Sequence, residues 1–110
     1  MNTQDVIMVI TNVPDRATAE RIAESLVTEN VAACVNILAE CISIYRWKGK
    51  IERTSEIPLL IKTTRAAYPR LEGAIRKMHP YEVPELIALP VSAGLPDYLN
   101  WVEAETRTRT

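Results

Sequence analysis

The chain has few of the residues on which most enzyme and metal motifs depend. Its 110 residues include three glycines, two cysteines and one histidine, and phenylalanine is absent. These glycines can form neither a dinucleotide-binding fingerprint nor a P-loop. With His79 alone and no zinc-type cysteine pair, one chain cannot build a tetrahedral zinc site by itself. A symmetric assembly would multiply these ligands.

Neither charge nor apolar segments indicate nucleic acid or a membrane as a partner. The formal net charge is −1, which provides no basic field for phosphate groups. No apolar run approaches the ~20 residues that cross a bilayer. The first five residues also lack the basic and then apolar order of a signal peptide. We therefore expect a cytoplasmic protein that binds neither nucleic acid nor a membrane.

The sequence contains no assembled set of catalytic residues. No serine stands in a strained strand-to-helix turn with a histidine and a carboxylate as partners. Paired carboxylates such as Glu82 and Glu85 are too common to indicate glycoside hydrolysis. We expect a protein without enzymatic activity, with an unrecognised activity as the less favoured alternative.

Hydrophobic periodicity and turn residues predict a single α+β domain over residues 1–110. The order is β-α-β-β-α-β plus a C-terminal helix, which is the ferredoxin-like arrangement with a four-stranded antiparallel sheet. The predicted elements are a strand at Val6–Ile10, a helix capped by Asp15 and stopped at Asn30, a hairpin over Ala32–Thr64, a helix capped by Thr64 and ended by Pro80, a strand at Glu85–Val91, and a helix after Gly94 that buries Tyr98, Trp101 and Val102.

The predicted hairpin is unusually long for a chain of this size. Lys48-Gly49 supplies its turn, since glycine accepts a positive φ at low cost. Each arm could reach about a dozen residues, or ~40 Å, whereas ordinary strands have about 3–10 residues. Such a hairpin overhangs its own domain, and its unpaired apolar edges need a partner. We expect that partner to be another copy of the chain.

Cys34 and Cys41 both fall on the outgoing arm of this hairpin. They are seven residues apart, so they face opposite sides of the strand unless a bulge intervenes. We expect them not to bridge each other and to stay reduced. Cys34 is either a small core residue or a soft ligand for copper.

The segment from His79 to Glu85 contains two prolines that fix a loop between the second helix and the last strand. This loop could present His79, Tyr81 and Glu82 or Glu85 to a ligand or a metal. Alternatively, His79 caps the carbonyl groups at the end of the preceding helix.

Aromatic and charged residues of the hairpin are further candidates. Tyr45 and Trp47 share one face and line either an aromatic pocket or a subunit interface. Glu56 and Lys62 lie in the apolar return arm, where they form a polar pocket or protect an edge.

Several segments together resemble the CutA family of divalent-cation-tolerance proteins. They lie in the order and spacing of that family over nearly the whole chain. The matching segments are Asn30–Asn36, Ser43–Glu52, Leu60–Thr64, His79–Glu85 and Tyr98–Trp101.

The resemblance implies a ferredoxin-like subunit in a tight homotrimer, similar to the trimeric PII signalling proteins. It also implies a cytoplasmic protein, without established enzymatic activity, that is connected with tolerance of copper and other divalent cations. Family members described as copper binding take ligands from the end of the first strand and from histidines before the Pro-Tyr motif. These positions hold Thr11, Met78 and His79 here, and Cys34 matches a family cysteine.

We therefore expect weak binding of copper or another divalent cation at His79 and Cys34. The alternative is a PII-like signalling or scaffold module that binds a small anion or a partner protein in a cleft between subunits. Trp47, Glu56, Lys62 and Tyr81 would line that cleft.

Overall fold

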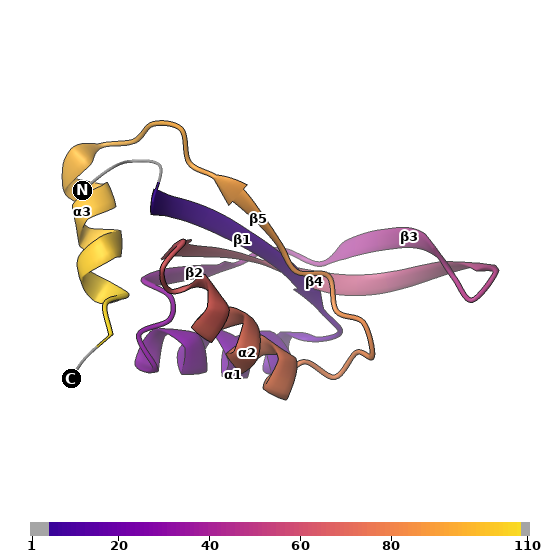
Figure 1. The fold of residues 1–110 in the computed structure, drawn as a ribbon. Coiled ribbons are helices and arrows are strands. Elements are labelled where there is room, and N and C mark those ends of the chain that lie inside the picture. Colours follow the sequence, from indigo (N-terminus) through magenta and orange to yellow (C-terminus); the bar gives the residue numbers. More distant parts are fainter. Residues whose placement is uncertain (1–4, 109–110) are drawn as a thin grey trace.

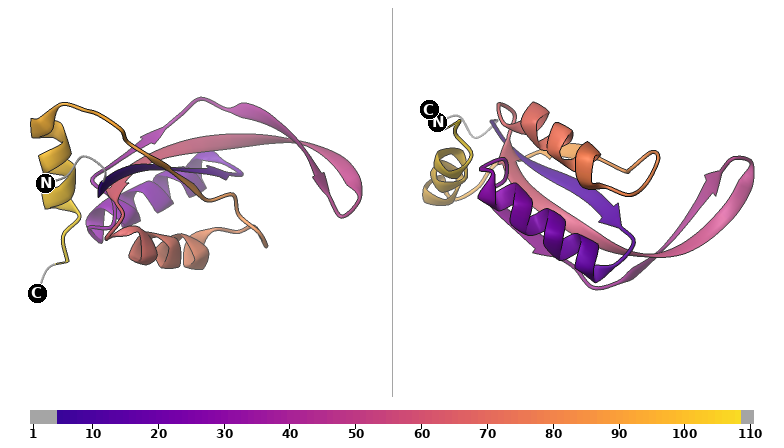
Figure 2. Two further views of the ribbon diagram at one scale, coloured as in Figure 1. Left: turned by 45° about the horizontal axis from the view of Figure 1, so that its top comes forward. Right: turned by 90° about the horizontal axis from the view of Figure 1, so that it is seen from below.

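The chain folds as a curved antiparallel sheet with helices on one side and a long hairpin at one end (Figures 1 and 2). The structure is a computed structural model that describes residues 5–108. Met1–Gln4, expected to hold no signal peptide, and residues 109–110 lie outside the described part. The elements are β1 (Val6–Val13), α1 (Arg16–Thr28), β2 (Cys34–Ile37), β3 (Cys41–Trp47), β4 (Lys50–Thr64), α2 (Tyr68–Met78), β5 (Ile87–Pro90) and α3 (Pro96–Glu105).

The strand order confirms the predicted ferredoxin-like α+β arrangement. β2, β4, β1 and β5 lie side by side in that order, and all neighbouring strands are antiparallel. β3 pairs with the outer part of β4, beyond β2. α1 and α2 cover the same face of the sheet (Figure 2), as right-handed crossovers require. α3 lies at the end of the molecule farthest from the hairpin tip (Figure 1).

The core lies between the sheet and the two helices that cover it. Ile22 and Leu26 of α1 and Leu71 and Ile75 of α2 are fully buried there, because each pair lies on one stripe of its helix. Alternate residues of β1 and β4 face them. The same periodicity identified these stripes from the sequence, so the core beneath the helices was predictable.

The signals that begin and end α1 act as predicted. Asp15 accepts a hydrogen bond from the backbone N–H of Thr18 (2.8 Å), and Asn30 takes a positive φ of 60° directly after the helix. The start of α2 differs from the prediction. Thr64 accepts from the N–H of Ala67 (3.2 Å), so it stabilises the turn before the helix and does not cap the helix itself.

The long hairpin is confirmed. β4 has 15 residues, or about 50 Å at strand rise. Lys48 and Gly49 form its two-residue turn with φ of 50° and 81°. The overhang elongates the molecule to 45 × 28 × 23 Å. Its radius of gyration is 14.5 Å, against roughly 13 Å for a compact chain of this length.

The outgoing arm of the hairpin is broken into two strands, so the sheet has five strands and not the four predicted. Ile37 lies opposite Leu59 and Cys41 opposite Glu56, so residues 38–40 face only residues 57–58. The N–H of Leu38 donates to the carbonyl of Pro58 (3.0 Å). In an antiparallel strand, the N–H and the carbonyl of one residue point to the same neighbouring strand. The nitrogen of Pro58, which has no hydrogen to donate, therefore also faces the outgoing arm. The pairing therefore breaks at Pro58 with a bulge.

The bulge changes the orientation of the two cysteines. Cys34 lies opposite Lys62 and Cys41 opposite Glu56, and these partners are an even number of residues apart on β4. The cysteines therefore project from the same face, and the prediction of opposite faces is wrong for the bulged strand. Both thiols are free, as predicted.

Beyond Val6, which α3 covers, the second face of the sheet is not covered by any described helix. Met8 and Ile10 of β1 point to this face and are only partly buried, although the continuous apolar run Val6–Ile10 is typical of a strand buried on both faces. Ile87 and Leu89 of β5 are 51% and 41% exposed beside them. The sheet thus presents an apolar surface on the side away from α1 and α2.

The C-terminal helix buries a different face from the predicted one. Leu99 and Val102 pack against Val6 beside the end of the sheet, because this i, i+3 pair faces the strands. Tyr98 and Trp101 lie half-exposed, with ring centroids 5.6 Å apart. Val102 was assigned correctly, whereas the two aromatic residues were not.

Candidate functional site

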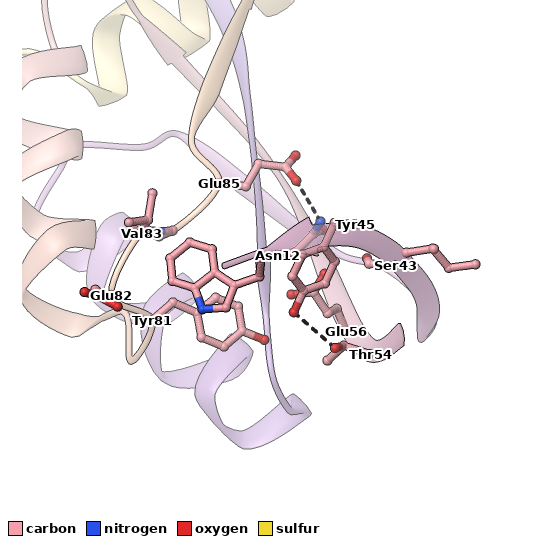
Figure 3. A pocket seen from close by; sticks show the side chains of 12 residues that line it. Asn12, Ser43, Tyr45, Thr54, Glu56, Tyr81, Glu82, Val83 and Glu85 are labelled. Atoms are coloured by element: carbon pink, nitrogen blue, oxygen red, sulfur yellow. Dashed lines mark hydrogen bonds between the residues drawn. The ribbon is translucent and has the colours of Figure 1, made fainter. Parts of the chain in front are cut away.

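A cavity of about 720 Å³ lies between the hairpin and the loop that follows α2 (Figure 3). Its walls come from the end of β1, from β3, from the outer part of β4 and from residues 81–85. We call it the hairpin cavity. Three of the predicted ligand-binding residues, Trp47, Glu56 and Tyr81, line it, whereas Lys62 does not.

The loop that closes the hairpin cavity is anchored to β1 at both ends. At one end, His79 Nε2 lies 2.7 Å from the carbonyl oxygen of Asn12. At the other, the hydroxyl of Thr11 donates to the carbonyl of Glu85 (2.7 Å), and the Asn12 amide donates to the Glu85 carboxylate (3.1 Å). The loop is therefore preformed, and its prolines and hydrogen bonds hold Tyr81 in place.

His79 is an anchor of this loop and does not line the cavity. It is buried, and its Nδ1 accepts a hydrogen bond from the N–H of Tyr81 (3.2 Å). Nε2 must then carry the proton that it donates to the carbonyl of Asn12. The neutral ring also packs against Tyr81, with centroids 4.8 Å apart. Both ring nitrogens are thus occupied within the chain.

Glu56 is the buried charged residue of the cavity, with 7% of its surface exposed. It lies at the inner end of the paired segment of the hairpin, opposite Cys41. The phenol of Tyr81 is its neighbour. Burial raises the pKa of Tyr81 well above the usual range, and a hydrogen bond to the Glu56 carboxylate adds to that increase. Tyr81 is therefore a hydrogen-bond donor at neutral pH.

The hairpin side of the cavity is aromatic and hydroxylic. Ser43, Tyr45 and Trp47 alternate along β3, so they share one face of the strand. The hydroxyl groups of Tyr45 and Thr54 are 3.1 Å apart, which fixes the Tyr45 ring across the two strands (Figure 3). At the rim, the ammonium group of Lys48 lies 5.6 Å from the centroid of the Trp47 ring.

Lys62 and Cys34 lie together at the other end of the sheet. They are opposite each other in the pairing of β2 with β4, and the Lys62 ammonium donates to the side-chain oxygen of Asn36. Cys34 lies beside the hydroxyl of Tyr98. Burial raises the pKa of Tyr98, and its interaction with Cys34 raises it further. Lys62 and Glu56 are six residues apart on one strand, or about 20 Å, and so cannot share a pocket within the chain.

Comparison with known proteins identifies the family. A family model described as "CutA1 divalent ion tolerance protein" matches residues 7–105. The chain belongs to the CutA1 family. Among its relatives is the divalent-cation tolerance protein CutA of Thermus thermophilus, which is 44% identical over 90% of this chain and 96% of the relative.

Solved CutA1 structures also share the fold. The CutA of Xylella fastidiosa superposes with a TM-score of 0.91 at 46% identity, covering 94% of this chain and 99% of that one. The CutA1 of Oryza sativa gives 0.92 at 38% identity, covering 98% and 100%. The CutA1 subunit fold therefore extends over nearly all of the chain, including the hairpin.

Within the CutA1 fold of this chain, the family's expected ligand positions are occupied by structural contacts. Thr11 is fully buried and bonded to the loop, and Met78 packs against the core. Across residues 5–108, no three or more His, Cys, Asp or Glu side chains are grouped to hold a metal ion. The same range holds no helix long and apolar enough to cross a membrane.

Sequence reasoning missed Asn12, Ser43 and Thr54 as cavity residues. Asn12 with Val13-Pro14-Asp15 is a composition typical of a turn, yet β1 continues through Val13 and places Asn12 at the cavity. Ser43 could have been found, because its alternation with Tyr45 puts both on one face.

Proposed function

We propose that this protein contributes to tolerance of divalent metal ions as a cytoplasmic homotrimer that catalyses no reaction. The observation that carries the proposal is the match of residues 7–105 to the CutA1 divalent ion tolerance family. The relative from Thermus thermophilus carries the name "Divalent-cation tolerance protein CutA". The compartment needs its own check by cell fractionation, since a solved relative from Archaeoglobus fulgidus is described as periplasmic.

The outer hairpin supports assembly. Ile42, Ile44 and Ile51 are 51%, 63% and 62% exposed. The pairing places all three on one face of the ribbon, since Ile51 lies opposite Arg46. An isolated two-stranded ribbon is at best marginally stable in water. The isoleucines share this face with Ser55, Arg46 and Arg53, and arginine is enriched at interfaces. Three copies, as the family resemblance implies, would cover it.

Assembly also determines where a metal could bind. Cys34 pairs with Lys62, which lies opposite Met8 of β1, whereas His79 contacts Asn12. Four residues along β1 span about 13 Å. One chain therefore cannot bring its thiol and imidazole to the same ion, so a site with both ligands has to lie between copies. Thiolate and imidazole are both suitable ligands for copper, and His79 binds an ion only when one of its hydrogen bonds, to Asn12 or to Tyr81, is given up.

Titration with copper tests the metal part of the proposal. Cu²⁺ is added to the purified assembly in a calorimeter, in wild type and in Cys34→Ser, with Cys41→Ser as the matched control because Cys41 is also a free, partly buried thiol on the same face. We expect Cys34→Ser to weaken binding by about tenfold or more, which is the usual cost of losing one soft ligand. His79→Asn, with circular dichroism as a check on folding, tests the imidazole.

Two results would contradict this proposal. Equal copper binding by wild type, Cys34→Ser and His79→Asn removes both residues from the site. Light scattering of the wild type should give about three times the chain mass of 12.4 kDa, and a mass that stays at one chain at all concentrations excludes the trimer.

The PII-like alternative has one observation in its favour, the hairpin cavity. Trp47, Glu56 and Tyr81 line it as that alternative requires, and a preformed cavity of this size suits a small molecule. Lys62, the residue expected to hold an anion, lies elsewhere. A signalling or scaffold role for this cavity therefore needs a ligand of a different charge or a partner protein.

A further inference from the structure

The side chains that line the hairpin cavity carry negative charge only, and Lys48 at the rim pairs with one of them, Glu82. Three carboxylates, Glu56, Glu82 and Glu85, line it, and no lysine, arginine or histidine does so among residues 5–108. The remaining polar groups are hydroxyls and the amide of Asn12, which donates to Glu85. An anion entering this cavity would meet like charge, whereas a cation would meet opposite charge.

The buried carboxylate of Glu56 is the second observation. It faces the cavity, and no cation among the described residues pairs with it. The phenol of Tyr81 is a hydrogen-bond donor to it but carries no positive charge. A buried carboxylate is costly unless it is hydrogen-bonded and paired. The missing positive charge is the chemical feature that a cationic ligand would supply.

The aromatic wall is the third observation. Tyr45, Trp47 and Tyr81 line the same cavity as the carboxylate, and aromatic faces attract cations within about 6 Å of the ring centroid. The rim already holds one such cation. The Lys48 ammonium lies 5.6 Å from the centroid of Trp47 and 3.8 Å from the carboxylate of Glu82. The chain itself therefore shows that these two groups accept an ammonium ion.

We propose that the hairpin cavity binds an organic cation, namely a primary ammonium group carried on a flat apolar body. The ammonium group binds to Glu56, and the apolar body packs between Tyr45, Trp47 and Tyr81. The cavity volume of about 720 Å³ lies in the range of small-molecule sites. This site goes beyond the proposed function, and it adjoins the proposed metal ligand His79 through Tyr81. Divalent metal is not required for it.

A charge series of three ligands with the same body tests the proposal. Phenethylamine, 2-phenylethanol and phenylacetate carry positive, zero and negative charge at neutral pH. Each is titrated into the full assembly in the presence of EDTA, with the fluorescence of Trp47 as the readout. A Trp101→Phe background leaves Trp47 as the only tryptophan, since the chain has two. Heteronuclear NMR of the same samples locates the bound ligand.

We expect phenethylamine to bind about tenfold or more tightly than 2-phenylethanol, and phenylacetate not to bind, because a buried charge pair dominates such differences. Glu56→Gln keeps the shape of the side chain and removes its charge, so it should abolish the preference for the amine. Glu24→Gln, on the exposed face of α1, is the matched control and should leave binding unchanged.

Several outcomes overturn the proposal. Equal binding of amine and alcohol shows a merely apolar cavity, and tighter binding of phenylacetate shows an anion site. Binding that survives Glu56→Gln places the ligand elsewhere. If none of the three binds, or if NMR shows that a second copy fills the cavity, the site does not exist. Failure of the copper titration has no bearing on these results, because EDTA is present throughout.

Discussion

The two halves of β4 differ in composition and in surroundings. In the inner half, Leu59 and Ile61 are fully buried, with β1 on one side, β2 on the other and α1 and α2 above. In the outer half, Lys50–Glu56, the one apolar residue Ile51 is 62% exposed and the strand pairs only with β3. The inner half is thus built for a core within the chain, whereas the outer half is not.

This contrast separates folding from assembly within one strand. The inner half stabilises the chain through its own core, so its side chains contribute whether or not a second copy is present. The outer half has hydrogen bonds along one side only, and Ile51, like Ile42 and Ile44 of the paired strand β3, gains a buried environment only from a partner. Substitutions in the two halves should therefore change different measurements.

The largest expected effect comes from a pair of substitutions, one in the inner half of β4 and one in β3, which pairs with the outer half. Ile61→Ala removes a fully buried side chain and should lower the free energy of unfolding by about 2–5 kcal/mol, measured with denaturant. Ile44→Asp places a charge on the exposed isoleucine face and should reduce the mass in light scattering from three chains to one. Its far-ultraviolet circular dichroism should stay that of a folded chain.

The reverse pattern would break the comparison. If Ile61→Ala separates the copies without loss of stability, or if Ile44→Asp unfolds the chain, folding and assembly are not divided between the halves. Val27→Asp on α1 is a control for Ile44→Asp, because Val27 is also exposed and apolar but lies far from the hairpin. It should leave the mass unchanged.

A smaller effect is expected at alkaline pH from Tyr81, which lies beside Glu56 near the middle of β4. The folded state raises the pKa of Tyr81, chiefly through burial and then through the hydrogen bond to Glu56. Its contribution to stability is complete below pH 10 and is lost as pH rises above that value. Tyr81→Phe should therefore make the free energy of unfolding fall less steeply above pH 10. The change in slope corresponds to at most one proton per chain.

Melting temperature measured from pH 8 to 12 checks this expectation. Tyr68→Phe serves as a comparison, because burial and nearby Glu72 raise the pKa of that phenol too, but it lies on α2 away from the cavity. Identical pH profiles for wild type and Tyr81→Phe would show that the Tyr81 phenol is not coupled to folding.

The smallest effect concerns two glycines, Gly49 in the hairpin turn and Gly73 in α2. Gly49 in the hairpin turn has a φ of 81°, so an alanine side chain is strained there although nothing lies within 4 Å of it. Gly73 lies in α2 with equally open space and helical backbone. We expect Gly49→Ala to destabilise by about 1 kcal/mol, and Gly73→Ala to stabilise by a similar amount. Thermal melts of the two variants should shift in opposite directions, and shifts of the same sign would contradict the assignment.

Much of the fold was predictable because its signals are local. The turn at Lys48-Gly49, the cap at Asp15 and the helical stripes ending at Met78 each depend on residues close together in sequence. The bulge was not predictable in the same way. It depends on which neighbour the missing N–H of Pro58 faces, and that is decided only when the strands pair.

The site was predictable in part, for the same reason. Trp47, Glu56 and Tyr81 carry unusual side chains for their surroundings, and the structure brings them to one cavity. Lys62 has the same signal, but its position along β4 puts it at the opposite end. Whether His79 would be a ligand or an anchor depended on Asn12, which is 67 residues away in sequence. Long-range pairing of this kind leaves no local pattern.

The bulge at residues 38–40 determines from which face of the hairpin each residue of β3 projects. Because strand side chains alternate with a period of two, pairing the same sequence in the Ile37–Leu59 register without the bulge would turn Ser43, Tyr45 and Trp47 to the face that Ile42 now occupies. The bulge thus decides which surface of the hairpin is aromatic and which carries the isoleucines. Which set of alternating residues occupies each face of the ribbon is therefore decided by the pairing register.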